Sequence, residues 1–151
     1  MRYIKFIWAF AVLLAAAISI SAQRSQTANF SNGRSTGSKS FEMLSFWTKD
    51  NKRNEIFYYT YKSRVRTEIP LLYSSKTSDR KGFILKSSKG IVLRIFPIGK
   101  RLKVYNESTK KTTWFIWEYV GPVDGVGTWC DSCIQEPLPA VRFVRKYFLT
   151  M

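Results

Sequence analysis

The chain has 151 residues, with 25 Lys and Arg against 10 Asp and Glu, and its formal net charge is +15. Such a charge favours anionic partners and says nothing about the fold. The chain contains no His, which excludes Ser-His and Cys-His nucleophile pairs and, with only two Cys, argues against a zinc site. We therefore expect neither a metal nor a cofactor.

The first 22 residues have the layout of a secretory signal peptide. Arg2 and Lys5 precede an uncharged apolar run from Ile7 to Ile20, and small residues follow as far as Ala22. This three-part pattern predicts cleavage after Ala22 and an exported protein, periplasmic or secreted, that is not integral to the membrane after cleavage. The alternative is an uncleaved anchor, for which the apolar run is somewhat short.

Residues 23–40 are rich in Ser, Asn, Gly, Thr and Gln, and Phe30 is their one large apolar residue. Such a stretch buries too little surface to offset the entropy lost when it becomes ordered. We therefore expect a flexible leader over residues 23–40, followed by a single β-rich domain over residues 41–151. Within that domain the segment Phe41–Lys49 fits either a short helix or an extra strand.

From Glu55 onward, β-branched and aromatic residues alternate with polar ones, which is typical of strands. Turn signals separate the runs, notably at residues 87–90 and 99–100. Seven or eight short strands at about ten-residue spacing predict an all-β fold, a small antiparallel barrel. The expected strands are Glu55–Tyr61, Arg64–Ile69, Gly82–Lys86, Ile91–Phe96, Arg101–Asn106, Thr112–Val120, Thr128–Ile134 and Ala140–Leu149. The residues expected to point inward include Leu102, Val104, Phe115, Trp117 and Val141.

Two cysteines, Cys130 and Cys133, follow Trp129 in a Trp-Cys-x-x-Cys motif. In redox proteins this motif opens a helix after a strand, whereas here Pro137 and Pro139 come shortly afterwards. In an exported protein we expect the two thiols to form a small structural disulfide with each other.

Basic residues recur every few positions between Lys39 and Lys111. On a strand, residues two apart share a face and lie about 7 Å apart, so Arg64 with Arg66 and Arg101 with Lys103 each present a pair of cations. Aromatic side chains exposed beside such cations can stack on sugar rings or bases. The candidate binding residues are Arg64, Arg66, Lys100, Arg101, Lys103 and Tyr105.

Part of the chain is similar to exported cell-wall modules. The matching features are the turn-like segment Tyr73–Ser78, the apolar run Val92–Phe96, the step Gly99–Val104, the hairpin Asn106–Thr113 and the closing segment Gly125–Trp129. Through them the stretch Leu71–Ile134 resembles the bacterial Src-homology-3-like family, which implies a small barrel that attaches to cell-wall glycan or peptide without catalysis. The Leu-Arg-x-x-Pro start typical of that family is missing, and two Cys interrupt the last strand.

Together these features predict an exported, non-catalytic binding protein for an anionic or glycan-containing surface of the cell envelope. One alternative is a secreted effector or immunity-type protein that binds another protein through the acidic segment near the cysteines. Another alternative is a glycan hydrolase that uses the carboxylate of Glu118 or Asp131, although the sequence shows no partner for either.

Overall fold

The computed structural model describes residues 25–34, 38–62, 65–118 and 133–150. The expected signal peptide (residues 1–22) lies outside the described residues, as do Arg64, Cys130 and Asp131. No helix in the described part of the chain has the length and hydropathy needed to cross a membrane.

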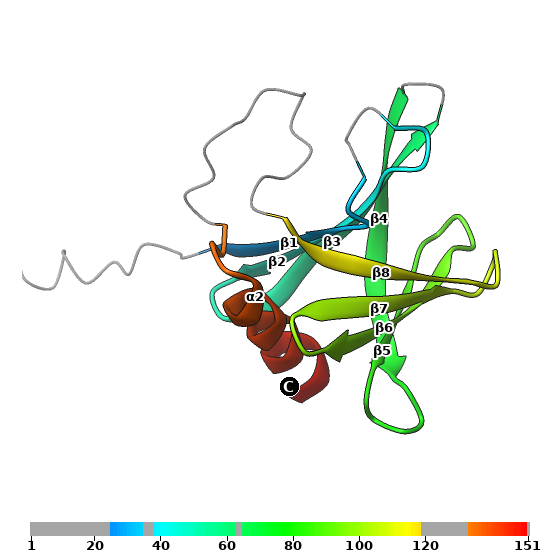
Figure 1. Ribbon diagram of the computed structural model, residues 1–151. Coiled ribbons are helices and arrows are strands. Elements are labelled where there is room, and N and C mark those ends of the chain that lie inside the picture. Colours follow the sequence, from blue (N-terminus) through cyan, green and yellow to red (C-terminus); the bar gives the residue numbers. More distant parts are fainter. Residues whose placement is uncertain (1–24, 35–37, 63–64, 119–132, 151) are drawn as a thin grey trace, which may run out of the picture.

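The described residues form eight strands that close into one antiparallel barrel (Figure 1). The strands are β1 (Gln26–Ser31), β2 (Glu42–Lys49), β3 (Lys52–Lys62), β4 (Val65–Lys76), β5 (Phe83–Lys86), β6 (Val92–Ile98), β7 (Arg101–Asn106) and β8 (Lys111–Glu118). Each strand pairs with the next one along the chain, and β8 pairs back with β1, which closes the barrel. The prediction of an all-β antiparallel barrel is confirmed, and the undecided segment Phe41–Lys49 forms β2 from Glu42 onward.

The prediction of a flexible leader over residues 23–40 is wrong for β1. This strand pairs with both β2 and β8 and turns Ala28 and Phe30 into the barrel, where both are fully buried. The residues between and beside them are polar. Composition missed the strand because only every second residue of a barrel strand faces the interior. The folded domain therefore includes residues N-terminal to the predicted boundary at residue 41.

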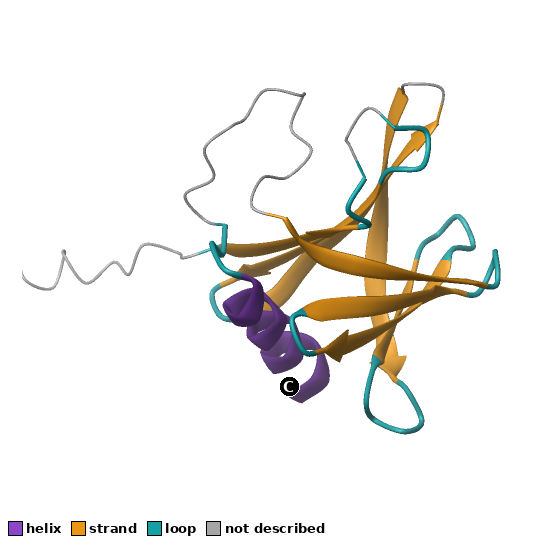
Figure 2. Cartoon of the chain, viewed as in Figure 1, coloured by secondary structure: helices purple, strands orange, loops and turns teal. Residues whose placement is uncertain are grey.

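The chain ends in helical turns, and the strand predicted over Ala140–Leu149 is wrong. Helix α2 (Pro137–Val144) continues into a π-helical segment, η1 (Arg145–Thr150), and both lie at one end of the barrel (Figure 2). Pro137 occupies the first helical position, where its fixed φ suits the start of a helix and its missing N–H has no cost. Val141 is buried as predicted, but from a helix.

Phenylalanine side chains fill the interior near the helical end. The ring of Phe148, in η1, lies 5.3 Å from that of Phe46 in β2 and 5.4 Å from that of Phe83 in β5, measured between centroids. Phe30 of β1 meets Phe46 at 6.0 Å, and all four side chains are fully buried. An eight-stranded barrel is just wide enough for side chains or for one small ligand, and here side chains occupy it.

The other residues predicted to point inward are buried or half-buried. Leu102, Val104 and Phe115 belong to the main core, and Trp117 packs against it. The Trp117 Nε1–H donates to the carbonyl oxygen of Ile134 at 2.9 Å, which ties β8 to the segment before α2. Most of the strand predicted over residues 128–134 lies outside the described residues.

β4 is longer than its pairing with β5. Residues 65–71 pair with β3, whereas β5 pairs only with residues 72–76. The strand continues through Pro70, which is paired with Phe57 of β3. A strand edge without a partner is a template for association with other chains, and charged side chains and proline oppose this. Arg66, Glu68 and Pro70 supply both features on this stretch.

Candidate functional site

The outer side of β6, β7 and β8 carries several of the cations predicted to bind. Residues alternate along β7, so Leu102 and Val104 enter the core while Arg101, Lys103 and Tyr105 point outward. Strand pairing sets these three beside outward residues of β6 and β8, in three rows. We call this surface the β6–β8 face; its residues are Arg94, Phe96, Ile98, Arg101, Lys103, Tyr105, Thr112, Trp114 and Ile116.

The middle row places a lysine between two aromatic residues. Lys103 is paired with Phe96 on β6 and with Trp114 on β8. Trp114 is 45% exposed, and Phe96 is half-buried. Exposed aromatic rings offer a flat apolar surface on which a sugar ring can stack, and the ammonium group between them can meet an anionic substituent.

The next row places an arginine between two isoleucines. Arg101 is paired with Ile98, which is 48% exposed, and with Ile116, which is 42% exposed. Within the described part of the chain, neither Arg101 nor Lys103 forms an ion pair or a side-chain hydrogen bond. Both cations are therefore available to an anion from outside the protein.

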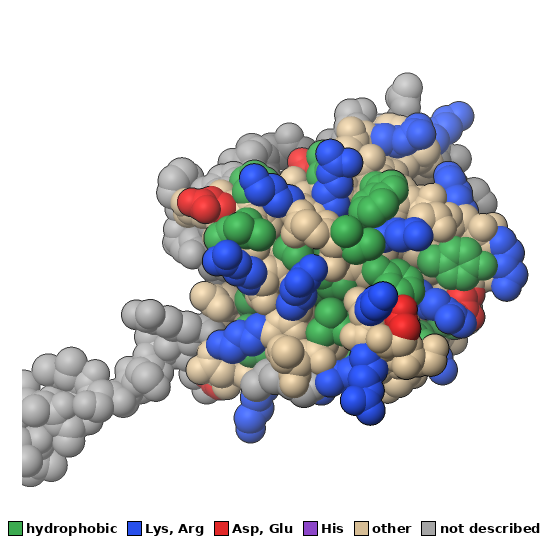
Figure 3. All heavy atoms as spheres, turned by 60° about the horizontal axis from the view of Figure 1, so that its bottom comes forward, with side chains coloured by type: hydrophobic (Ala, Val, Ile, Leu, Met, Phe, Trp, Pro, Cys, Tyr) green, Lys and Arg blue, Asp and Glu red, His purple; other side chains and the backbone are tan. Residues whose placement is uncertain are grey.

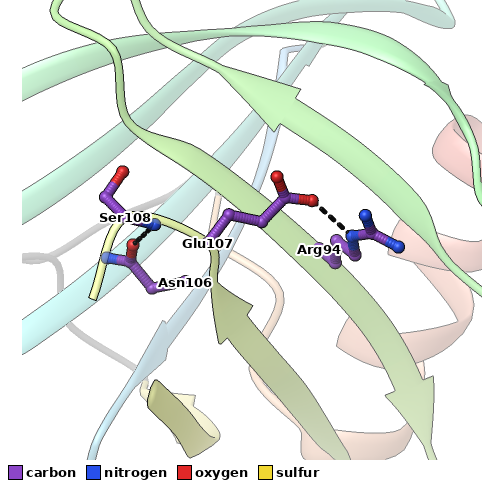
Figure 4. A network of polar contacts seen from close by, with 4 residues as sticks. All are labelled: Arg94, Asn106, Glu107 and Ser108. Atoms are coloured by element: carbon purple, nitrogen blue, oxygen red, sulfur yellow. Dashed lines mark hydrogen bonds and ion pairs between the residues drawn. The ribbon is translucent and has the colours of Figure 1, made fainter. Parts of the chain in front are cut away.

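The third row is electrostatically different, because its cation is already paired. The Arg94 Nε donates to Glu107 Oε1 at 2.5 Å (Figure 4). The turn that carries Glu107 is held by the Ser108 N–H, which donates to Asn106 Oδ1 at 3.0 Å. Tyr105 lies between Arg94 and Thr112 in this row. The unpaired positive charge of the face is thus concentrated at its other two rows.

The remaining predicted cations do not all join this face. Lys100 lies in the turn between β6 and β7, directly before Arg101. Arg66 lies on β4, three strands away from β7 around the barrel, and its guanidinium carbon is 5.8 Å from the centroid of the Tyr59 ring. Arg64 lies outside the described residues. The structure therefore brings Lys100, Arg101, Lys103 and Tyr105 together and separates Arg66 from them.

Sequence reasoning did not assign the apolar members of the β6–β8 face to a binding site. The alternation in β8 places Trp114 and Phe115 on opposite sides of the strand, and this much is readable from the sequence. The prediction that Phe115 points inward is confirmed, because it is 1% exposed, and Trp114 is therefore the outer residue. A signal was present, because Trp114 and Ile116 have the same spacing as Arg101 and Lys103.

Polar side chains enter the barrel interior at the end away from the helix. A cavity of about 10 Å³ lies there, lined by residues that include Glu42, Tyr58, Asn106 and Thr113. That volume suits about one water molecule. Burial, and then the neighbouring Glu42 carboxylate, raise the pKa of Tyr58 well above its usual range. This cavity is too small for an organic ligand, so the candidate site lies on the outer surface.

We expect Tyr58 to make the barrel sensitive to alkaline pH. A tyrosine in the unfolded chain ionises near pH 10, whereas folded Tyr58 keeps its proton to higher pH. Above about pH 10 the unfolded state therefore binds fewer protons than the folded state, and the free energy of unfolding falls with rising pH. The melting temperature of wild type, followed from about pH 8 to pH 11, should fall more steeply than that of Tyr58→Phe. Parallel curves for the two proteins would contradict this prediction.

The carboxylate proposed for a hydrolase reaction is engaged in the barrel wall. Glu118 is half-buried at the end of β8 and accepts a hydrogen bond from Ser31 Oγ on β1. The second candidate, Asp131, lies outside the described residues. Within the described ranges, no cluster of three or more Cys, Asp or Glu side chains is arranged to hold a metal ion.

Cys133 lies buried beside β1. Its Sγ accepts a hydrogen bond from Asn29 Nδ2 at 3.5 Å, and Asn29 Oδ1 in turn accepts one from Ser45 Oγ at 2.6 Å. A short parallel bridge to Thr27 holds the backbone at this point. Cys130 lies outside the described residues, so the disulfide between the two cysteines remains a prediction.

Comparisons with protein-family models, with curated proteins and with solved structures found no match. The resemblance to the Src-homology-3-like family therefore remains a hypothesis. The stretch that carries it, Leu71–Ile134, corresponds to the second half of β4 and the strands that follow. It leaves out β1, β2 and β3, which complete the barrel.

Proposed function

We propose that the chain is an exported, non-catalytic binding protein that holds an anionic, glycan-containing polymer of the cell envelope on its β6–β8 face. The observation that carries this proposal is the setting of Arg101 and Lys103. Each cation is exposed, has no partner among the described residues, and lies between two apolar side chains of the neighbouring strands. A cation between apolar surfaces matches an anionic group carried on a sugar ring.

The spacing of the two cations suits a polymer with repeated charges. Arg101 and Lys103 lie two residues apart on one strand, which separates their backbone positions by about 7 Å. Basic side chains lie among hydrophobic ones, with few acidic ones, on the side of the molecule shown in Figure 3. The net charge of +15 would draw an anionic polymer toward the protein and raise the rate of encounter.

Removal of the two cations should weaken binding to purified cell walls. We expect Arg101→Ser/Lys103→Ser to bind about tenfold more weakly than wild type at 0.1 M salt, because charge-assisted contacts to the polymer are lost. The difference between the two proteins should shrink at 1 M salt, where the Debye length falls from about 10 Å to about 3 Å. Co-sedimentation of each protein with cell walls across this range of salt would measure both effects.

A matched control removes the same charge elsewhere. Lys86 and Lys89 are exposed in β5 and in the turn that follows it, so Lys86→Ser/Lys89→Ser should bind nearly as wild type does. An equal loss in both variants would show that only net charge matters. Wild-type binding that ignores salt, or a clear preference for a single-stranded oligonucleotide over cell-wall glycan, would overturn the proposal.

The two alternative functions rest on other parts of the chain. Binding of another protein was predicted through the acidic segment near the cysteines, most of which lies outside the described residues. Hydrolysis of a glycan would require Glu118 to act with a partner. A solubilised polysaccharide that is cleaved by wild type and not by Glu118→Gln would favour that alternative over simple binding.

A further inference from the structure

A groove of about 420 Å³ opens where three segments meet at the helical end of the barrel. The segments are the loop between β4 and β5, the turn between β6 and β7, and η1. Apolar side chains and cationic side chains both line it. The apolar residues are Phe96, Pro97, Ile98 and Leu149, and the charged residues are Asp79, Arg80, Lys81 and Arg145.

The loop between β4 and β5 is ordered by its own hydrogen bonds. The Thr77 N–H donates to the Gly82 carbonyl at 2.8 Å, and the Gly82 N–H donates to Thr77 Oγ1 at 2.9 Å. The Asp79 carboxylate accepts from Thr77 Oγ1 at 2.6 Å and from the Lys81 N–H at 3.0 Å. The Thr77 hydroxyl is the main cause that lowers the pKa of Asp79. Asp79 is the one carboxylate that lines the groove, and it is thus hydrogen-bonded within its own loop.

Arg80, which lines the groove, has a backbone conformation that suits glycine better. Its φ is 55°, in the left-handed region that residues with a Cβ adopt at a cost. Within the described part of the chain its guanidinium group has no hydrogen bond or ion pair. Neither the backbone nor a contact inside the protein therefore explains an arginine at this position.

Arg145, in η1, supplies a second cation to the lining of the groove. Its Nη2 donates to the carbonyl oxygen of Pro97 at 2.8 Å, which fixes the guanidinium group against the end of β6. No other partner of this side chain lies among the described residues, so its remaining donors can serve a ligand. The groove thus combines apolar side chains with cations, of which Arg145 is held in place by the Pro97 carbonyl.

We propose that this groove binds one molecule of a single-chain anionic amphiphile, whose carboxylate or phosphate lies at Arg80 and Arg145 and whose alkyl chain lies along Phe96, Ile98 and Leu149. The cations favour an anionic group, and the apolar lining favours a ligand with an alkyl chain over a bare ion. The volume falls within the range of about 300–1,000 Å³ typical of small-ligand sites. The groove shares Phe96 and Ile98 with the proposed polymer site, but its cations are different: Arg80 and Arg145 here, Arg101 and Lys103 there.

Calorimetric titration with dodecyl phosphate, kept below its critical micelle concentration, tests this proposal. We expect Arg80→Gly to bind it at least about fivefold more weakly, because a charge-assisted contact is lost. The same substitution relaxes the backbone at this position, so the melting temperature should not fall. Ile98→Ser, at a residue 48% exposed, should weaken binding through the loss of apolar contact with the alkyl chain.

Lys110→Gly is the matched control, because Lys110 is also a cation with a φ of 55° and lies in the turn between β7 and β8. Lys110→Gly should bind dodecyl phosphate as wild type does. Arg101→Ser/Lys103→Ser should also bind it as wild type does, and this expectation holds even if wild type does not bind cell walls. The proposal is overturned if Lys110→Gly loses as much affinity as Arg80→Gly, or if the Arg101 and Lys103 variant loses it. It is also overturned if uncharged dodecyl maltoside binds equally well, or if wild type binds phosphatidylglycerol vesicles but not the monomer.

Discussion

The substitution Phe148→Ala should lower the free energy of unfolding by about 3–5 kcal/mol. Phe148 is fully buried, and its ring packs against Phe46, Phe83 and Tyr73 with centroid distances of 5.3, 5.4 and 6.4 Å. Its removal takes away transfer free energy and leaves a cavity that the rigid barrel wall cannot collapse to fill. Urea unfolding of wild type and variant, followed by tryptophan fluorescence, would measure the difference.

The matched control for this prediction is Leu138→Ala, which truncates an apolar residue of α2 that is 37% exposed. It should cost less than about 1 kcal/mol, because little burial is lost. If Phe148→Ala lowers the free energy of unfolding by less than about 1 kcal/mol, then η1 does not pack into the end of the barrel in solution. An unchanged m-value would confirm that the variant unfolds from the same folded state.

The substitution Gly82→Ala should destabilise the protein by about 1–3 kcal/mol through overpacking alone. An added Cβ would lie 2.5 Å from the carbonyl oxygen of Ile95 and 2.6 Å from the ring of Phe96. The first of these atoms belongs to the backbone of β6 and cannot turn away as a side chain can. The strand must therefore shift, which would also displace Phe96 on the β6–β8 face.

Gly90→Ala separates the effect of space from that of conformation. Gly90 has a φ of 79°, and nothing lies within 4 Å of the position of an added Cβ. Gly90→Ala should therefore lower the free energy of unfolding by about 1–2 kcal/mol, and only because alanine disfavours the left-handed backbone conformation. Gly82→Ala should in addition weaken cell-wall binding, whereas Gly90→Ala should not. A Gly82→Ala protein with wild-type stability would show that β6 can yield at this point.

Most of the strands were predictable because the signal is local. β-branched and aromatic residues alternate with polar ones in the segments that form β3 to β8, and turn residues lie between them. The two errors fell at the ends of the described chain, where the local signal is weak or misleading. β1 looks too polar to fold by itself, and it is stabilised by pairing with two neighbours at once. α2 is short, and its two prolines lie in its first turn, where a proline is compatible with a helix but does not by itself indicate one.

The candidate site was only half predictable. Two outward cations on one strand follow from the alternation around Leu102 and Val104, and the structure places Arg101 and Lys103 together as expected. The sequence does not show which strands become neighbours, so it could not place Phe96 and Trp114 on either side of Lys103. For the same reason it grouped Arg66 with cations that lie three strands away.

The amino-acid sequence by itself determined that the chain forms mostly β-strands, that inward and outward residues alternate along each strand, and that positive charge is in excess. These properties depend only on neighbouring residues and on composition. Only the tertiary structure decided which side chains of neighbouring strands lie beside one another, such as Phe96 and Trp114 on either side of Lys103. It also brought the loop after β4, the turn after β6 and η1 together around one groove. The physical reason is that barrel closure joins residues far apart in the chain: β1 pairs with β8, and Phe148 packs against Phe46. No local pattern contains that information.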